Sequence, residues 1–189
     1  MLIRRQQSLL LVVDLQEKLA PAICEGERAI RNSARLLEGA RRLGVPAFVS
    51  EQYVKGLGPS VEAIRQAATK PGEATAAVDA KFFEKTHFSC TAEPGVAELL
   101  GAAERRQVVL TGTETHVCVL QTGMGLLAAG YSVFLVADAA SSRRRGDHQA
   151  GVERLRAAGA QVVTTEMVLF EWLEAACTDE FRAMLPLIR

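Results

Sequence analysis

Short, nearly continuous apolar runs alternate along this chain with longer stretches of helical periodicity. The apolar runs, bounded by turn residues, lie at 8–13, 46–50, 76–83, 107–112, 132–137 and 161–165. Runs without polar alternation are typical of strands covered on both faces, as in a parallel sheet. Helical spacing fills most of the gaps, at 27–43, 93–103, 116–129 and 147–158. The pattern predicts βαβ units in a three-layer α/β/α fold, and, since no linker or repeat interrupts it, a single domain over residues 1–189.

Composition narrows the classes of partner. The 22 basic and 22 acidic residues balance, which gives no electrostatic reason to expect a nucleic acid or an anionic membrane. The longest apolar run, Leu9–Val13, is too short to span a bilayer, and the few residues before it predict no signal or transit peptide. The cysteines contain no CxxC pair, so neither a zinc site nor a disulfide framework is expected. A cytoplasmic protein with a small-molecule substrate fits these features.

Three residues with reactive side chains follow predicted strands. In open parallel sheets, ligands bind beyond the carboxyl ends of the strands. Asp14 ends the first strand, Lys85 follows the third and Cys118 follows the fourth. We therefore expect these side chains to lie at one edge of the sheet.

Asp14 and Lys85 each allow two interpretations. A carboxylate at the end of a buried strand must be paired or have its pKa raised, but Asp14 could instead cap a helix. Position 16 is Gln16 rather than a second Asp, and no glycine-rich turn follows, which disfavours phosphatase and dinucleotide sites. Lys85 is either a solvated loop lysine or a partly buried one, in which case Asp14 is the obvious anion to pair with it.

Cys118 begins a predicted helix, where backbone N–H groups and the helix dipole favour a thiolate. This position predicts a lowered thiol pKa and a place to bind an oxyanion. The alternative is a small apolar core residue, which is our interpretation of Cys24, Cys90 and Cys177. His116 would point away from Cys118 on a helix, so it is expected at a pocket edge rather than as a base. The Arg143–Arg145 run is either an exposed loop or a rim that guides anions.

Three motifs, VVDLQ, KTHFS and TGTETHVCV, together resemble the isochorismatase-like cysteine hydrolases, a superfamily that includes nicotinamidases and N-carbamoylsarcosine amidohydrolases. The resemblance covers nearly the whole chain in order and spacing. The segments EQYVKGLGP (51–59) and GTETHVCVLQT (112–122) look most like the isochorismatase-domain-containing branch.

The resemblance implies a six-stranded parallel sheet in the order 3-2-1-4-5-6 and a catalytic triad of Asp14, Lys85 and Cys118. It also implies a cis peptide between Thr113 and Glu114, and an oxyanion hole formed by the backbone N–H groups of Glu114 and Cys118. Family members usually form dimers or larger homo-oligomers. The implied reaction is hydrolysis of an amide-type bond through a thioester on Cys118, with no cofactor.

The sequence also departs from some relatives. Nicotinamidases hold a zinc ion with an Asp and histidines after the second strand, whereas SEQYVKGLG contains no histidine. We therefore predict no metal and no nicotinamidase activity. Candidate pocket residues near the strand ends are Gln16, Glu51, Tyr53, His87 and His116, although each could be an ordinary polar loop residue. Glu51 and Glu114 could each favour a cationic or amine-bearing substrate.

Two other functions remain open at this point. The chain could be a catalytically idle interaction or scaffold protein that keeps the fold, or it could bind a small molecule without turnover.

Overall fold

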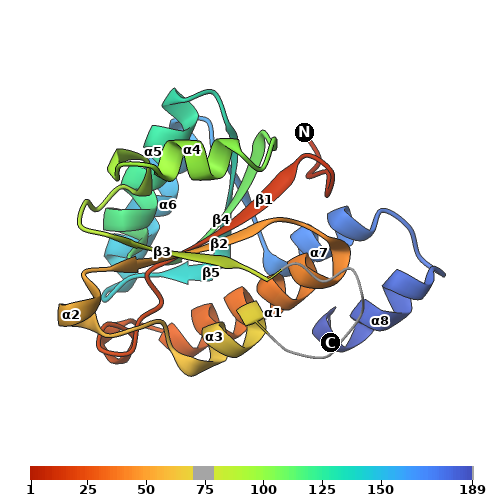
Figure 1. Cartoon of the computed structure of the whole chain (residues 1–189), viewed down its shortest axis with the longest axis horizontal. Coiled ribbons are helices and arrows are strands. Elements are labelled where there is room, and N and C mark those ends of the chain that lie inside the picture. The colour runs from red at the N-terminus through yellow and green to blue at the C-terminus, as the bar shows by residue number, and fades with distance from the viewer. Residues whose placement is uncertain (70–78, 189) are drawn as a thin grey trace.

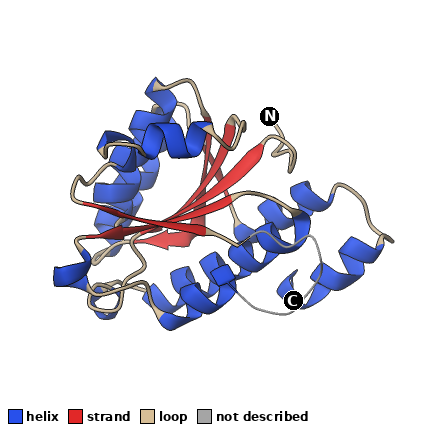
Figure 2. Cartoon of the chain, in the orientation of Figure 1, coloured by secondary structure: helices blue, strands red, loops and turns tan. Residues whose placement is uncertain are grey.

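The computed structural model describes residues 1–69 and 79–188. These residues form a six-stranded, all-parallel sheet with helices packed against it (Figures 1 and 2). The strands are β1 (Ser8–Val13), β2 (Ala47–Gln52), β3 (Lys81–Lys85), β4 (Gln107–Thr113), β5 (Ser132–Ser141) and β6 (Gln161–Val163). Their order is β3-β2-β1-β4-β5-β6. The predicted fold class and strand order are confirmed.

Several strand ends differ from the apolar runs. Residues 76–78 of the third predicted strand lie outside the described residues, and β3 begins at Lys81 and runs on to Lys85. The fifth strand continues past residue 137 to Ser141, because its pairing with β4 resumes there after a shift in register. The sixth strand is shorter than predicted and ends at Val163, since Thr164 caps the next helix.

Helices cover both faces of the sheet (Figure 1). On one face lie α1 (Gly26–Leu43), α3 (Glu62–Thr69), α7 (Thr165–Leu173) and α8 (Asp179–Ile188), and on the other lie α4 (Val96–Gly101), α5 (Leu120–Ala128) and α6 (Arg145–Ala157). The short helix α2 (Val54–Leu57) lies beyond the end of β2. The predicted helix 116–129 is divided: a π-helical turn, Thr115–Val119, precedes α5. In the part of the chain that is described, no helix combines the length and apolar character needed to cross a bilayer.

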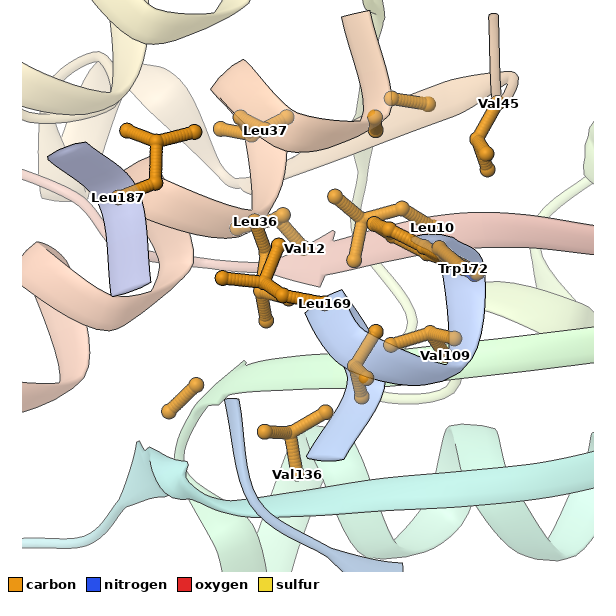
Figure 3. Close-up of a cluster of buried hydrophobic side chains, with 14 of the residues drawn as sticks. Leu10, Val12, Leu36, Leu37, Val45, Val109, Val136, Leu169, Trp172 and Leu187 are labelled. Carbon is orange, nitrogen blue, oxygen red and sulfur yellow. The ribbon is translucent and has the colours of Figure 1, made fainter. Parts of the chain in front are cut away.

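Two apolar clusters, one on each face, explain why the strands show no polar alternation. Leu10 and Val12 of β1 point toward α1 and α7, whereas Leu9 and Leu11 belong to the cluster on the opposite face. Trp172 of α7 lies within the first cluster, as Figure 3 shows. Because helices cover both faces of the inner strands, a ligand can approach these strands at their ends.

Trp172→Ala is expected to lower the free energy of unfolding by about 3–5 kcal/mol, because it opens a cavity in a fully buried cluster. Chemical denaturation followed by circular dichroism measures the change. Phe170→Ala in the same helix is the control: that ring is 44% exposed, so a loss of about 1 kcal/mol or less is expected. Equal losses in both variants would contradict the placement of α7.

Candidate active site

Three side chains that the sequence places far apart meet at the carboxyl edge of the sheet. Asp14 follows β1, and Lys85 ends β3, two strands away. The long side chain of Lys85 crosses the end of β2, and its Nζ lies 2.7 Å from Asp14 Oδ2 with both side chains fully buried. The predicted pairing of Lys85 with Asp14 is confirmed.

The Asp14 carboxylate receives a different donor on each oxygen. Lys85 Nζ donates to Oδ2, and Ser50 Oγ donates to Oδ1 at 2.7 Å. Burial raises the pKa of Asp14, while Lys85 and the Ser50 hydroxyl act in the opposite direction. The alternative that Asp14 caps a helix is wrong, because the next helical turn begins only at Ala20.

Lys85 is held by a ring of acceptors. Besides Asp14, its Nζ donates to Gln52 Oε1 at 2.6 Å and to the carbonyl oxygens of His87 and Phe88 at 3.3 and 3.2 Å. The solvated-lysine alternative is therefore wrong. Its Nζ is held beside the carboxylate because its N–H donors face these four acceptor oxygens.

Cys118 lies in the π-helical turn that leads into α5, and it is 7% exposed. Burial, followed by the negative charge of Asp14, raises the pKa of the Cys118 thiol, and the charge of Lys85 only partly offsets this. The prediction of a lowered pKa at a helix start is wrong, because burial and the Asp14 carboxylate together raise the pKa of this thiol. The resting thiol keeps its proton, and a carboxylate that can accept it lies close by.

The turn before Cys118 carries further features of the site. The Thr113–Glu114 peptide bond is cis, and Glu114 is the residue that precedes the π-helical turn. The Glu114 carbonyl accepts from the N–H groups of Val117 and Val119 at 3.0 and 3.2 Å. The segment after β4 thus places Cys118 within the first turn of a continuous helical run.

The Glu114 carboxylate forms an ion pair with Arg143. Its Oε2 accepts from the backbone N–H and from Nε of Arg143 at 3.1 and 2.9 Å. Arg145, in the same run, pairs instead with Glu25 at 2.8 Å. This does not fit the expectation that Glu114 favours a cationic substrate, because its charge already has a partner.

The Gln16 side chain is used within the protein, which favours the alternative of an ordinary polar loop residue. Its side chain is fully buried, and Nε2 donates to the carbonyls of Gln52 and Gly58 at 3.0 and 2.6 Å while Oε1 accepts from the Gln52 N–H at 2.8 Å. Glu51 has a similar role, since its Oε1 accepts from the Ser60 N–H at 2.6 Å. Both residues hold the loop after β2 in place.

The remaining candidate pocket residues, Tyr53, His87 and His116, are exposed or half-buried. Tyr53 is 58% exposed and borders, next to Lys85, a shallow cleft of about 300 Å³. His87 is exposed, with Nδ1 2.9 Å from Glu93 Oε2 at the same cleft. His116 is half-buried, with Nδ1 3.0 Å from Ser142 Oγ, so it does not pair with Cys118. These contacts give His87 and His116 other partners, whereas the Asp14 carboxylate acts directly on the Cys118 thiol.

Sequence reasoning missed Ser50 and Gln52, which bind Asp14 and Lys85 directly. Both lie at the carboxyl end of the second strand, so the strand-end rule could have found them had it been applied there. Within residues 1–69 and 79–188, no group of three or more His, Cys, Asp or Glu side chains is placed to hold a metal ion.

Comparison with known proteins identifies what this chain is similar to. The family model of the isochorismatase domain matches residues 8–167. Isochorismatase domain-containing protein 2 of Danio rerio is 36% identical over 181 residues, which cover 96% of this chain and 86% of that protein. Isochorismatase domain-containing protein 1 of Salmo salar is 42% identical over 179 residues, covering 93% of this chain and 59% of that protein. The structure of MAR1 ribonuclease from Caenorhabditis elegans matches with a TM-score of 0.89 at 35% identity, covering 100% of this chain and 92% of that one.

Proposed function

The chain belongs to the isochorismatase family of hydrolases, and from this membership we propose that it hydrolyses a small amide-type or related acyl substrate through a thioester on Cys118. The observation that carries the proposal is the buried Asp14–Lys85 pair beside the Cys118 thiol. A thiol with an adjacent carboxylate that can accept its proton is one arrangement that activates a nucleophile.

In the first step, Asp14 accepts the thiol proton as Cys118 Sγ attacks the substrate carbonyl carbon. The pKa values of thiol and carboxyl are both raised by burial, so the proton moves during the attack rather than before it. The carbonyl oxygen becomes an oxyanion, which the backbone N–H groups of Glu114 and Cys118 stabilise. Lys85 holds the carboxyl group in place through its hydrogen bond to Oδ2.

In the second step, Asp14 returns the proton to the leaving amine, the C–N bond breaks, and the acyl group remains on sulfur. Water then attacks the thioester while Asp14 accepts one of its protons. The C–S bond breaks, Asp14 gives the proton taken from water to Cys118 Sγ, and the carboxylic acid product leaves. One carboxyl group thus acts first as base and then as acid in each half of the reaction.

A small carbonyl substrate fits this site better than an RNA strand. The similarity to the MAR1 ribonuclease structure raises the possibility of an RNA substrate. However, Asp14, Lys85 and Cys118 are 0%, 2% and 7% exposed, so a polymer backbone would have to enter a nearly closed site. The balanced charge of 22 basic and 22 acidic residues also offers no general attraction to phosphates.

A substrate panel tests the proposal. Small amides, carbamoyl compounds, imides and a structured RNA are incubated with wild type and with Cys118→Ala, and products are detected by mass spectrometry. We expect turnover of one class of small acyl compound by wild type only. RNA cleavage that persists in Cys118→Ala would support a ribonuclease instead. Ligand-induced thermal stabilisation without turnover or adduct would support a binding protein. The absence of turnover, adduct and stabilisation would support an idle scaffold.

A further inference from the structure

Ser50 forms hydrogen bonds to the proposed base, Asp14. It pairs with Val13 across the β1–β2 ladder, and its carbonyl accepts from the Asp14 N–H at 3.1 Å. Its side chain is fully buried and donates from Oγ to Asp14 Oδ1 at 2.7 Å. Backbone and side chain of Ser50 therefore both bind Asp14.

The two donors on Asp14 differ in what they supply. Lys85 brings a positive charge to Oδ2, whereas Ser50 brings a neutral, directed donor to Oδ1. With only one oxygen held, a carboxylate can still turn about its last side-chain bond, where the torsional preference is broad. With both oxygens held, the plane of the carboxylate and its orientation toward the thiol are fixed.

We propose that Ser50 is a positioning residue that orients the Asp14 carboxylate toward Cys118 and favours its ionised form. This inference rests on the proposed function only in taking Asp14 as the base. Ser50 does not touch the reacting atoms, because its single hydroxyl proton is directed at Asp14. Its removal changes no charge, which separates its effect from that of Lys85.

The test is the rate of Cys118 alkylation by iodoacetamide against pH, followed by mass spectrometry, which requires no known substrate. In wild type, the rate should fall as pH falls through the pKa of Asp14, because a protonated carboxyl cannot accept the thiol proton. In Ser50→Ala, the ionised form loses a donor, so the Asp14 pKa rises. We expect the midpoint to move up by about one pH unit and the plateau rate to fall about 10-fold.

Two further variants make the result specific. Ser50→Thr keeps the hydroxyl and should retain the wild-type midpoint. Ser33→Ala is the matched control, because Ser33 is equally buried but its hydroxyl is hydrogen-bonded to Thr111 Oγ1 and the Ala139 carbonyl instead. A wild-type midpoint in Ser50→Ala, or an equal shift in Ser33→Ala, would overturn the positioning role. Should Ser50→Ala not fold, a shifted midpoint in Ser50→Thr would overturn it equally.

Asp14→Asn separates this inference from the proposed function. If Asp14→Asn leaves the alkylation profile unchanged, Asp14 is not the base, and the proposed mechanism fails together with the positioning role. If Asp14→Asn removes the midpoint while Ser50→Ala does not move it, only the positioning role fails.

Discussion

Replacing Cys118 with alanine is expected to reduce turnover of a substrate found in the panel by roughly 10⁴-fold or more, because the reaction loses its nucleophile. Cys118→Ser should also be severely impaired. The raised pKa of the Cys118 thiol already makes Asp14 a necessary base, and a serine hydroxyl is far less acidic than a thiol. Steady-state kinetics on the folded variants measures both losses.

The covalent intermediate gives an independent check on this result. Intact-mass analysis of wild type quenched during turnover should show one acyl group, and peptide mapping should place it on Cys118. Cys90→Ala and Cys177→Ala are the controls, one for a buried thiol and one for an exposed thiol, and both should retain the adduct. Near-wild-type turnover in Cys118→Ala, or an adduct on another cysteine, would rule out the proposed mechanism.

Lys85→Met is expected to lower the free energy of unfolding by about 3–5 kcal/mol, because it leaves the Asp14 carboxylate buried without its ion-pair partner. Lys85 opposes the rise in the pKa of Asp14 that burial causes, so its removal raises that pKa further. A carboxyl whose pKa is raised by folding stabilises the protein relatively more at low pH, where both states are protonated. The loss in free energy of unfolding caused by Lys85→Met should therefore grow as pH rises through the wild-type pKa of Asp14. It should level off above the pKa that Asp14 has in the variant.

Urea denaturation at pH 5 and pH 8 measures this trend. The double variant Asp14→Asn/Lys85→Met should recover much of the lost stability and show no such pH dependence, because neither buried charge remains. Lys81→Met is the matched control, since Lys81 is exposed on the same strand and should change stability by about 0.5 kcal/mol or less. A loss in Lys85→Met that is equal at both pH values would contradict the buried pair.

The fold could be predicted well from the sequence, since its signal is local along the chain. The run at Leu9–Val13 has no polar position because helices cover both faces of β1. Strand lengths were less predictable. The extension of β5 to Ser141 depends on its pairing with the end of β4, a contact that the residues of β5 do not encode alone.

The site could be predicted in part. A strand-end rule was enough to select Asp14, Lys85 and Cys118, but similar polar residues near the same edge have different roles. Gln16 was one candidate for ligand contact, yet its amide binds backbone groups of Gln52 and Gly58. Ser50, which was not singled out, binds the carboxylate of Asp14.

The sequence by itself determined the layers of the fold, the edge of the sheet where reactive groups gather, and the thiol that we propose as the nucleophile. The tertiary structure alone decided how that thiol behaves. Burial and the nearby charge of Asp14 raise the pKa of Cys118, and both depend on how the surrounding segments pack. The partners of Asp14 lie 36 and 71 residues along the chain, so only folding brings them within hydrogen-bond distance.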